Sequence, residues 1–252
     1  MRRKWLIIGM LSALGILAVH AEEGVTFYLN TGDKVSFAFS EHPVVKLSGD
    51  ELTISVAGSS LEDKEELGKY RKVVNGHIFV NLGLPSGLYW ATCNVGAETE
   101  TDYGNYYAWG ETTTKSSYTS DNSTWCGRFH SGDLTPSEDV ATANWGKGTR
   151  MPTYDEMEEL KNNCTWEWQN NYNNTSVNGY LVTGSNSQSV FFPAAGYRGG
   201  SSHNYAGSNG YYWTSSPDSN YNYSYGLYFY SGSVDTRNYY RGFGLSVRAV
   251  CQ

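Results

Sequence analysis

The sequence predicts an α+β fold with a largely antiparallel sheet in its main domain, preceded by a small all-β module. Apolar and polar residues alternate in short runs along most of the chain, which is typical of half-buried strands. Only two segments have helical periodicity, and strand-like runs precede and follow them. A third observation concerns residues 196–241, where 11 Tyr, 9 Ser, 7 Gly and 5 Asn fill 32 of 46 positions. These residue types make adaptable binding surfaces, so the composition favours recognition over catalysis.

The N-terminus predicts an export signal. Residues 2–4 are basic, residues 5–19 are apolar, and residues 19–21 (Val-His-Ala) suit cleavage before Glu22. The apolar run is short for a membrane-spanning helix, and no second run of spanning length follows. We therefore expect a signal peptide over residues 1–21 and an exported chain without a transmembrane span, destined for the periplasm, the outer surface or the medium. An uncleaved anchor is the alternative.

The net charge and the cysteine spacing limit which ligands and bonds are expected of this chain. Cleavage removes three of the 18 basic residues and none of the 25 acidic ones, leaving a net charge of −10. Nucleic acid is excluded as a partner, because its binding depends on Lys and Arg that neutralise phosphates. An exported chain permits disulfides, and four cysteines allow three pairings, between which the spacing does not choose. No CxxC spacing occurs and no cofactor or metal is expected; the cysteines are Cys93, Cys126, Cys164 and Cys251.

Residues 22–57 are expected to form the small β module. Alternating runs flank turn signals at residues 30–33 and 48–50, which predicts two hairpins. A unit of this size is marginal alone, so we expect it to pack on the next domain or on a partner. Residues 58–76 are charged and end in an Asn-Gly turn, which predicts a linker.

The main domain is expected over residues 77–252, with two strands first and two short helices next. One helix is predicted at residues 139–145. The other starts at Thr153, where Glu156 three positions later completes a capping box. The acids at 155–159 suggest a catalytic pair, but we interpret them as first-turn acids that favour the helix dipole. Strands are predicted at residues 78–82, 88–95, 180–183, 190–195, 211–215, 226–230 and 243–250.

Several blocks of this domain resemble the Fibrobacter succinogenes major paralogous domain family, which is common in gut and rumen Bacteroidetes-like bacteria. The resemblance covers nearly all of residues 78–250, in the expected order. The matching blocks are VNLGLPSGLYWATCNVGA at 80–97, YGNYYAWGE at 103–111, RMPT at 150–153, FPAAGYR at 192–198, YWTSS at 212–216 and GLSVR at 244–248.

The resemblance implies a C-type lectin-like domain with antiparallel sheets, two short helices and long loops, related to the formylglycine-generating (sulfatase-modifying) enzymes. It does not imply their oxidase chemistry, because they need cysteines in the C-terminal active-site region. This chain has none between Cys164 and Cys251. The Glu-Pro-Asn or Gln-Pro-Asp calcium motif of lectins is also missing. Asn81 and Ala249 depart from the family pattern, which usually has an acid and a proline there.

Few residues are grouped in a way that suggests a catalytic site, so we expect that the protein is not an enzyme. The histidines at 42, 77, 130 and 203 are isolated and are interpreted as surface or hydrogen-bonding residues. Asp218 and Asp235 are the only acids of the Tyr-rich segment; a glycosidase pair there has no support from the resemblance.

Ligand binding is expected at loops 201–209, 218–225 and 235–240 and on the adjoining strand, because loops on a rigid scaffold commonly carry function. On that strand, either Leu227 and Phe229 face inward while Tyr228 and Tyr230 face outward, or the reverse. Trp213 is expected to be buried, and Arg198 and Arg248 to be structural hubs. The candidate ligand-binding residues are Asn204, Tyr205, Tyr221, Asn222, Tyr223, Tyr225, Tyr228, Tyr230, Asn238, Tyr239 and Tyr240.

Three functions are compatible with these observations. The first is a secreted or cell-surface, non-catalytic binding protein that recognises a glycan or a protein. The second is a variable protein of a diversity-generating retroelement, since mutation of adenines in Asn codons yields Tyr, Ser, Asp and His. The third is an enzyme of unknown reaction or a structural surface component.

Overall fold

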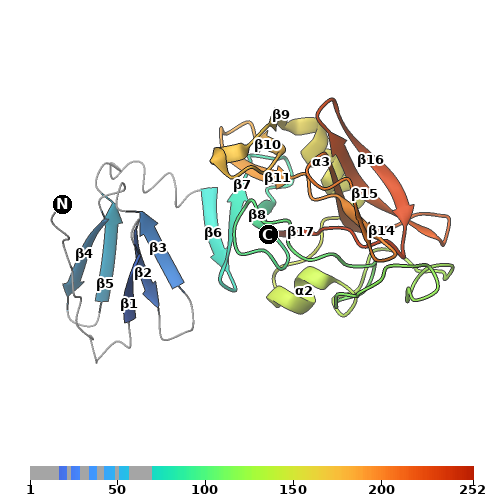
Figure 1. Cartoon of the computed structure of the whole chain (residues 1–252), viewed down its shortest axis with the longest axis horizontal. Coiled ribbons are helices and arrows are strands. Elements are labelled where there is room, and N and C mark those ends of the chain that lie inside the picture. The colour runs from blue at the N-terminus through green and yellow to red at the C-terminus, as the bar shows by residue number, and fades with distance from the viewer. Residues whose placement is uncertain (1–16, 22–23, 29–33, 39–42, 49–50, 57–69) are drawn as a thin grey trace. The chain divides into compact units, whose positions relative to one another are not determined.

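The computed structural model describes residues 17–21, 24–28, 34–38, 43–48, 51–56 and 70–252, with side chains from residue 70 onward. The chain divides into two compact units, Met1–Gly68 and Lys69–Gln252 (Figure 1).

The first unit is made of antiparallel strands. Strands β1 to β3 form one sheet, and β4 and β5 form a hairpin. The pairing of β2 with β3 and of β4 with β5 confirms the two predicted hairpins. Strand β1 covers the last five residues of the predicted signal peptide; the rest of that segment, His42 and most of the predicted linker lie outside the described residues. The strands are β1 (Leu17–Ala21), β2 (Gly24–Tyr28), β3 (Lys34–Ala38), β4 (Pro43–Ser48) and β5 (Glu51–Val56).

The second unit is held together by a four-stranded antiparallel sheet in the order β17-β8-β7-β6. Its first and last strands in the chain, β6 and β17, therefore belong to one sheet. The predicted linker was wrong over residues 71–76, which form β6 and a tight turn. Asn75 and Gly76 have φ of 50° and 81° in this turn, as a two-residue hairpin requires. The strands are β6 (Arg71–Val74), β7 (His77–Asn81), β8 (Tyr89–Asn94) and β17 (Arg248–Cys251).

Both predicted helices are confirmed: α2 is Val140–Trp145 and α3 is Tyr154–Asn163. Thr153 caps α3, and its capping box with Glu156 is complete. A short 3-10 turn, η2 (Tyr172–Asn174), follows later.

The C-terminal half is built of three antiparallel sheets. Their orders are β11-β10-β9, β12-β13 and β14-β15-β16. Ser231-Gly232 turns the β15–β16 hairpin. The strands are β9 (Thr165–Gln169), β10 (Gly179–Thr183), β11 (Ser189–Pro193), β12 (Tyr197–Gly199), β13 (Ser202–Asn204), β14 (Asn209–Pro217), β15 (Tyr223–Tyr230) and β16 (Ser233–Tyr240).

The loop and strand predictions need correction here. Residues 235–240 lie in β16, residues 202–204 in β13 and residues 223–225 in β15. Conversely, of the strand predicted at 243–250, only the part from Arg248 belongs to a strand. Strand β16 is the edge of its sheet and carries polar residues on both faces, so its sequence lacks the apolar alternation of a half-buried strand.

The β14–β15–β16 sheet lies between two hydrophobic clusters. Strand alternation places Leu227 and Phe229 on the face toward α3, where both are fully buried, while Tyr230 on the other face is exposed. This confirms the first of the two predicted orientations for Leu227, Phe229 and Tyr230, whereas Tyr228 is half-buried against the other cluster. Trp213 is fully buried in the cluster on the opposite face.

Arg248 is the hub of the second unit. It is fully buried and donates to Asn94 Oδ1 (2.9 Å) and to the carbonyls of Ala91 (2.9 Å), Thr92 (2.6 Å) and Phe191 (2.8 Å). It thereby ties β8 to β11, as expected of a structural residue. Arg198 is only half-buried.

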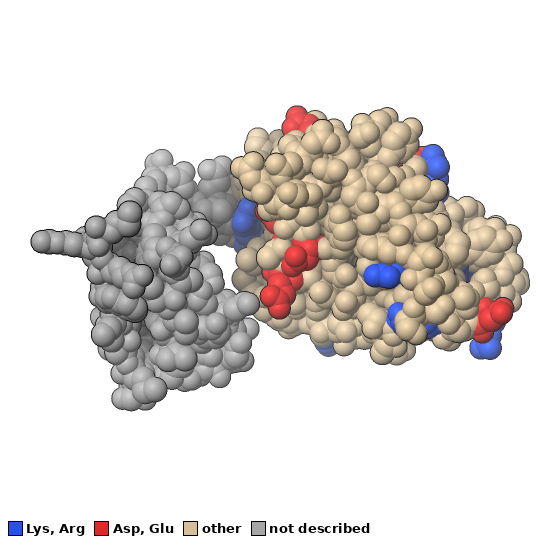
Figure 2. All heavy atoms as spheres, in the orientation of Figure 1, with Lys and Arg blue, Asp and Glu red and all other residues tan. Residues whose placement is uncertain are grey.

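The four cysteines, which all lie in the described part of the chain, are free. Within residues that the structure describes, no helix is long and apolar enough to cross a membrane. The visible face of the second unit carries scattered charged side chains on a mostly uncharged surface (Figure 2).

Candidate functional site

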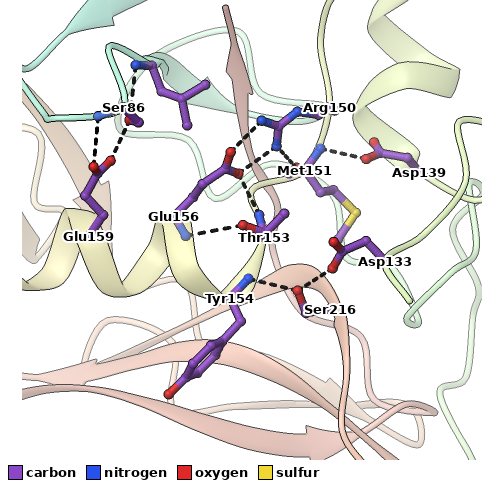
Figure 3. A network of polar contacts seen from close by, with 11 residues as sticks. Ser86, Asp133, Asp139, Arg150, Met151, Thr153, Tyr154, Glu156, Glu159 and Ser216 are labelled. Atoms are coloured by element: carbon purple, nitrogen blue, oxygen red, sulfur yellow. Dashed lines mark hydrogen bonds and ion pairs between the residues drawn. The ribbon is translucent and has the colours of Figure 1, made fainter. Parts of the chain in front are cut away.

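The acids of α3 have structural partners. Arg150 Nη1 and Nη2 donate to the two carboxylate oxygens of Glu156 at 2.6 Å each, and Thr153 N donates to Glu156 at 2.8 Å (Figure 3). Burial alone raises the pKa of Glu156, but the hydrogen bonds from Arg150 and Thr153 and the Arg150 charge hold it below its ordinary value. Glu159 accepts from Ser86 N (2.9 Å) and Oγ (2.5 Å). Asp155 and Glu156 lie in the first turn of α3 as predicted, whereas Glu158 and Glu159 lie beyond it, which corrects that part of the prediction.

The same network reaches the C-terminal sheet. Ser216 Oγ on β14 accepts from Tyr154 N at 2.9 Å and donates to Asp133 (Figure 3). Buried Asp139 accepts from Met151 N at 2.7 Å and from Thr142 N at 3.0 Å. Burial raises the pKa of Asp139. These groups satisfy one another and anchor α3 to its neighbours.

The described histidines are packed against aromatic rings. His77 stacks on Trp145 with ring centroids 3.8 Å apart. His130 lies between Trp109 and Trp125, and His203 Nε2 is 2.8 Å from Tyr106 Oη. Among residues 70–252, no group of three or more His, Cys, Asp or Glu is arranged to hold a metal.

The two aspartates of the Tyr-rich segment serve separate contacts. Asp218 accepts from Asn220 N (2.7 Å) and Asn238 Nδ2 (3.1 Å). Asp235 pairs with Arg237 at 3.3 Å and lies 4.0 Å from Lys161. None of these contacts joins Asp218 to Asp235 as the two carboxylates of a glycosidase pair.

A chain of five aromatic rings crosses the surface of the C-terminal half, and we call it the aromatic track. Successive ring centroids are 4.4, 5.7, 5.1 and 6.2 Å apart. Every member is exposed or half-buried, with Tyr205 at 60 % and Tyr240 at 41 % exposure. The order along the track is Tyr223 on β15, Tyr240 on β16, Phe243 after β16, Tyr197 on β12 and Tyr205 after β13.

Three tyrosines pack together on the face of the sheet that points away from α3, and one of them, Tyr211, contacts the track. We call them the tyrosine floor: Tyr211, Tyr228 and Tyr239. Tyr211 contacts Tyr197 of the track at 5.0 Å and the other two floor rings at 5.2 and 5.4 Å. Burial raises the pKa of Tyr211 and of Tyr239. The hydroxyl of Tyr239 is buried without a hydrogen-bond partner among the described residues.

Arg241 fixes one end of the track. Its side chain is fully buried over the Trp109 ring, 4.4 Å from the centroid. It donates to the Tyr223 carbonyl (2.9 Å) and to the Arg128 carbonyl (2.8 Å). Burial lowers the pKa of Arg241. The start of β15 is thus bound to the loop around Arg128.

The candidate ligand-binding residues chosen from the sequence lie in different parts of the structure. Tyr205, Tyr223 and Tyr240 lie on the track, whereas Tyr228 and Tyr239 lie in the floor. Tyr221 packs against exposed Phe129, Tyr225 against Tyr154, and Tyr230 against Tyr228. Of the three amides, Asn222 and Asn238 are exposed and Asn204 is half-buried.

Two members of the track were missed by sequence reasoning. Tyr197 and Phe243 were assigned to framework blocks at the borders of the Tyr-rich segment. Glycines on both flanks were the available signal: Gly196 and Gly199 bracket Tyr197, and Gly242 and Gly244 bracket Phe243. Small neighbours leave an aromatic side chain uncovered.

Comparison with known proteins gives one match. The model of a domain of unknown function (DUF8237) matches residues 162–250, which include α3's last two residues, strands β9 to β16 and the whole aromatic track. No curated protein matches the chain. No solved structure matches it.

Proposed function

We propose that this chain is an exported, non-catalytic binding protein that recognises a glycan or a protein through the aromatic track. The observation that carries the proposal is the unbroken line of five accessible rings. Exposed amides at Asn222 and Asn238 add hydrogen-bonding capacity nearby. The N-terminal segment, with its basic start and apolar run, supports export.

The track suits binding because its rings are already ordered. Ring contacts and the tyrosine floor fix their positions, so a ligand meets a surface with little side-chain entropy left to lose. Tyr205 has a φ of 57°, and its carbonyl accepts from Asn209 N at 3.0 Å. Left-handed backbone is uncommon for a bulky residue and is often found at functional sites.

The proposal includes a C-type lectin-like fold and membership of the Fibrobacter-type major paralogous domain family. Two short helices among antiparallel sheets, with β17 beside β8, are compatible with that fold. The sequence blocks between residues 80 and 248 support the family assignment.

A binding assay with matched variants tests the proposal. The labelled full chain is applied to an array of glycans and surface proteins. We expect the combined Tyr205→Ala and Tyr240→Ala variant to lose binding by at least about tenfold, because exposed aromatic anchors dominate such contacts. Phe129→Ala is the control, since Phe129 is 65 % exposed but lies off the track. Equal binding by the double variant and the wild type would refute the site.

A further inference from the structure

We propose that the ligand of the aromatic track is a neutral glycan chain, bound lengthwise over several rings. This inference rests on the proposed function and names its ligand class. It follows from the length of the track, the chemistry of its rings, the charge around it and the placement of the amides.

The track is longer than one sugar. It runs through four centroid-to-centroid steps of 4.4 to 6.2 Å, from Tyr223 to Tyr205. A pyranose ring has about the size of one phenol ring and covers one step at most. The ring planes are turned 27° to 62° from one another along the track, so contact with every ring requires an oligosaccharide that bends with it.

The accessible apolar groups of this surface are aromatic. Among the described residues, the exposed large aliphatic side chains are Val73 and Ile78, both on the β6–β7 hairpin. The track itself has none. Flat π faces suit the C–H faces of sugar rings.

The arginines of residues 196–243 are already engaged, which favours a neutral ligand. Arg241 is fully buried. Arg237 pairs with Asp235 and covers the Tyr228 ring at 4.4 Å, so it also closes that ring to a ligand. Arg198 lies over the Tyr106 ring at 5.4 Å. Between Gly196 and Phe243 the chain has no lysine, so an acidic glycan finds no unengaged cation in this segment.

An amide lies next to the middle of the track. A Cβ on Gly199 would be 3.2 Å from Tyr197 Cε2, 3.6 Å from Asn204 Nδ2 and 3.7 Å from Phe243 Cε1. Two track rings and the Asn204 amide therefore meet closely around Gly199, where a Cβ would be tight against the Tyr197 ring. An amide both donates and accepts hydrogen bonds, which matches the sugar hydroxyl.

Chain-length dependence tests this inference. The full chain is titrated with neutral and acidic oligosaccharides from mono- to hexasaccharide, and with proline-rich peptides, which also bind aromatic surfaces. We expect affinity to rise by at least about tenfold from monosaccharide to hexasaccharide, since each stacked ring adds contact. Tyr205→Ala, at one end of the track, should reduce this gain and leave the weak monosaccharide affinity nearly unchanged. Phe129→Ala should behave as the wild type.

The remaining outcomes separate this inference from the proposed function. Track-dependent binding of acidic glycans or peptides alone would overturn the neutral-glycan inference while the binding function stands. Equal affinity for mono- and hexasaccharide would overturn lengthwise binding. Binding of no probe, or only binding that persists in Tyr205→Ala combined with Tyr240→Ala, would reject both.

Discussion

The two faces of the β14–β15–β16 sheet are both rich in aromatic residues, yet they differ in how the rings are covered. Toward α3, Tyr212, Leu227 and Phe229 are fully buried with Met157 and Leu160. On the opposite face, Tyr211 contacts half-buried Tyr197 and Tyr228 contacts exposed Tyr230. The same residue types therefore form a closed core around Leu227 and Phe229, and partly open ring contacts around Tyr211 and Tyr228.

Hydrogen bonding distinguishes the faces as well. The hydroxyl of Tyr212 donates to the Pro193 carbonyl at 2.6 Å and accepts from Asn94 Nδ2 at 3.3 Å. Burial raises the pKa of Tyr212 to about 12. The buried hydroxyl of Tyr239 has no such partner in the described part of the chain. The buried hydroxyl of Tyr212 on the core face is therefore paired, whereas that of Tyr239 in the floor is not.

The largest expected effect is on the core face. Phe229→Ala removes a fully buried ring that contacts Tyr180 and Tyr212. We expect it to lower the free energy of unfolding by about 3–5 kcal/mol. Urea denaturation measures the change. A loss below about 1 kcal/mol would show that this face is not closed.

Removal of single hydroxyls gives the sharpest comparison of the faces. Tyr212→Phe should lower the free energy of unfolding by about 1–3 kcal/mol, because it removes the buried hydroxyl that donates to the Pro193 carbonyl and accepts from Asn94 Nδ2. Tyr239→Phe should leave it unchanged or raise it by up to about 1 kcal/mol, because a buried, unpartnered hydroxyl is removed. Urea denaturation of both variants measures these changes. An equal loss of free energy of unfolding in the two variants would contradict the assignment of a paired hydroxyl to Tyr212 and an unpaired one to Tyr239.

The anchoring of α3 to the core face should depend on pH. The pKa of Glu156 in the folded protein is below its ordinary value. The ionised carboxylate therefore stabilises the fold at pH values above its unfolded-state pKa, and this stabilisation is lost as the pH falls through its folded-state pKa. We expect the wild type to lose about 1 kcal/mol more stability than Glu156→Gln between about pH 6 and pH 3. Denaturation midpoints at several pH values measure this. Parallel curves for the two proteins would contradict it.

The smallest stability effect is expected on the track. Tyr205 is 60 % exposed, so Tyr205→Ala should change the free energy of unfolding by less than about 0.5 kcal/mol. Thermal and urea denaturation check this. A loss comparable to that of Phe229→Ala would mean that Tyr205 is part of the core.

Local sequence signals predicted much of the framework. The capping box at Thr153 and the alternation around Leu227 and Phe229 depend on neighbouring residues alone, so both could be inferred. Strand β16 escaped prediction because an edge strand with polar residues on both faces resembles a loop. The track as a whole could not be predicted from the sequence, because it includes the contact between Tyr197 and Phe243, which forms only after distant strands pair. The residue composition indicated which segment carries the binding surface, but only the tertiary structure shows which aromatic residues belong to the track.

The most direct test of the account maps a bound ligand onto the rings. NMR spectra of protein labelled at Tyr and Phe rings are recorded during titration with a neutral hexasaccharide. The account predicts shifts at Tyr197, Tyr205, Tyr223, Tyr240 and Phe243, smaller ones in the tyrosine floor, and none at Tyr212 and Phe229. Shifts confined to Phe129 and Tyr221, or shifts at Tyr212 and Phe229 as large as those of the track rings, would contradict it.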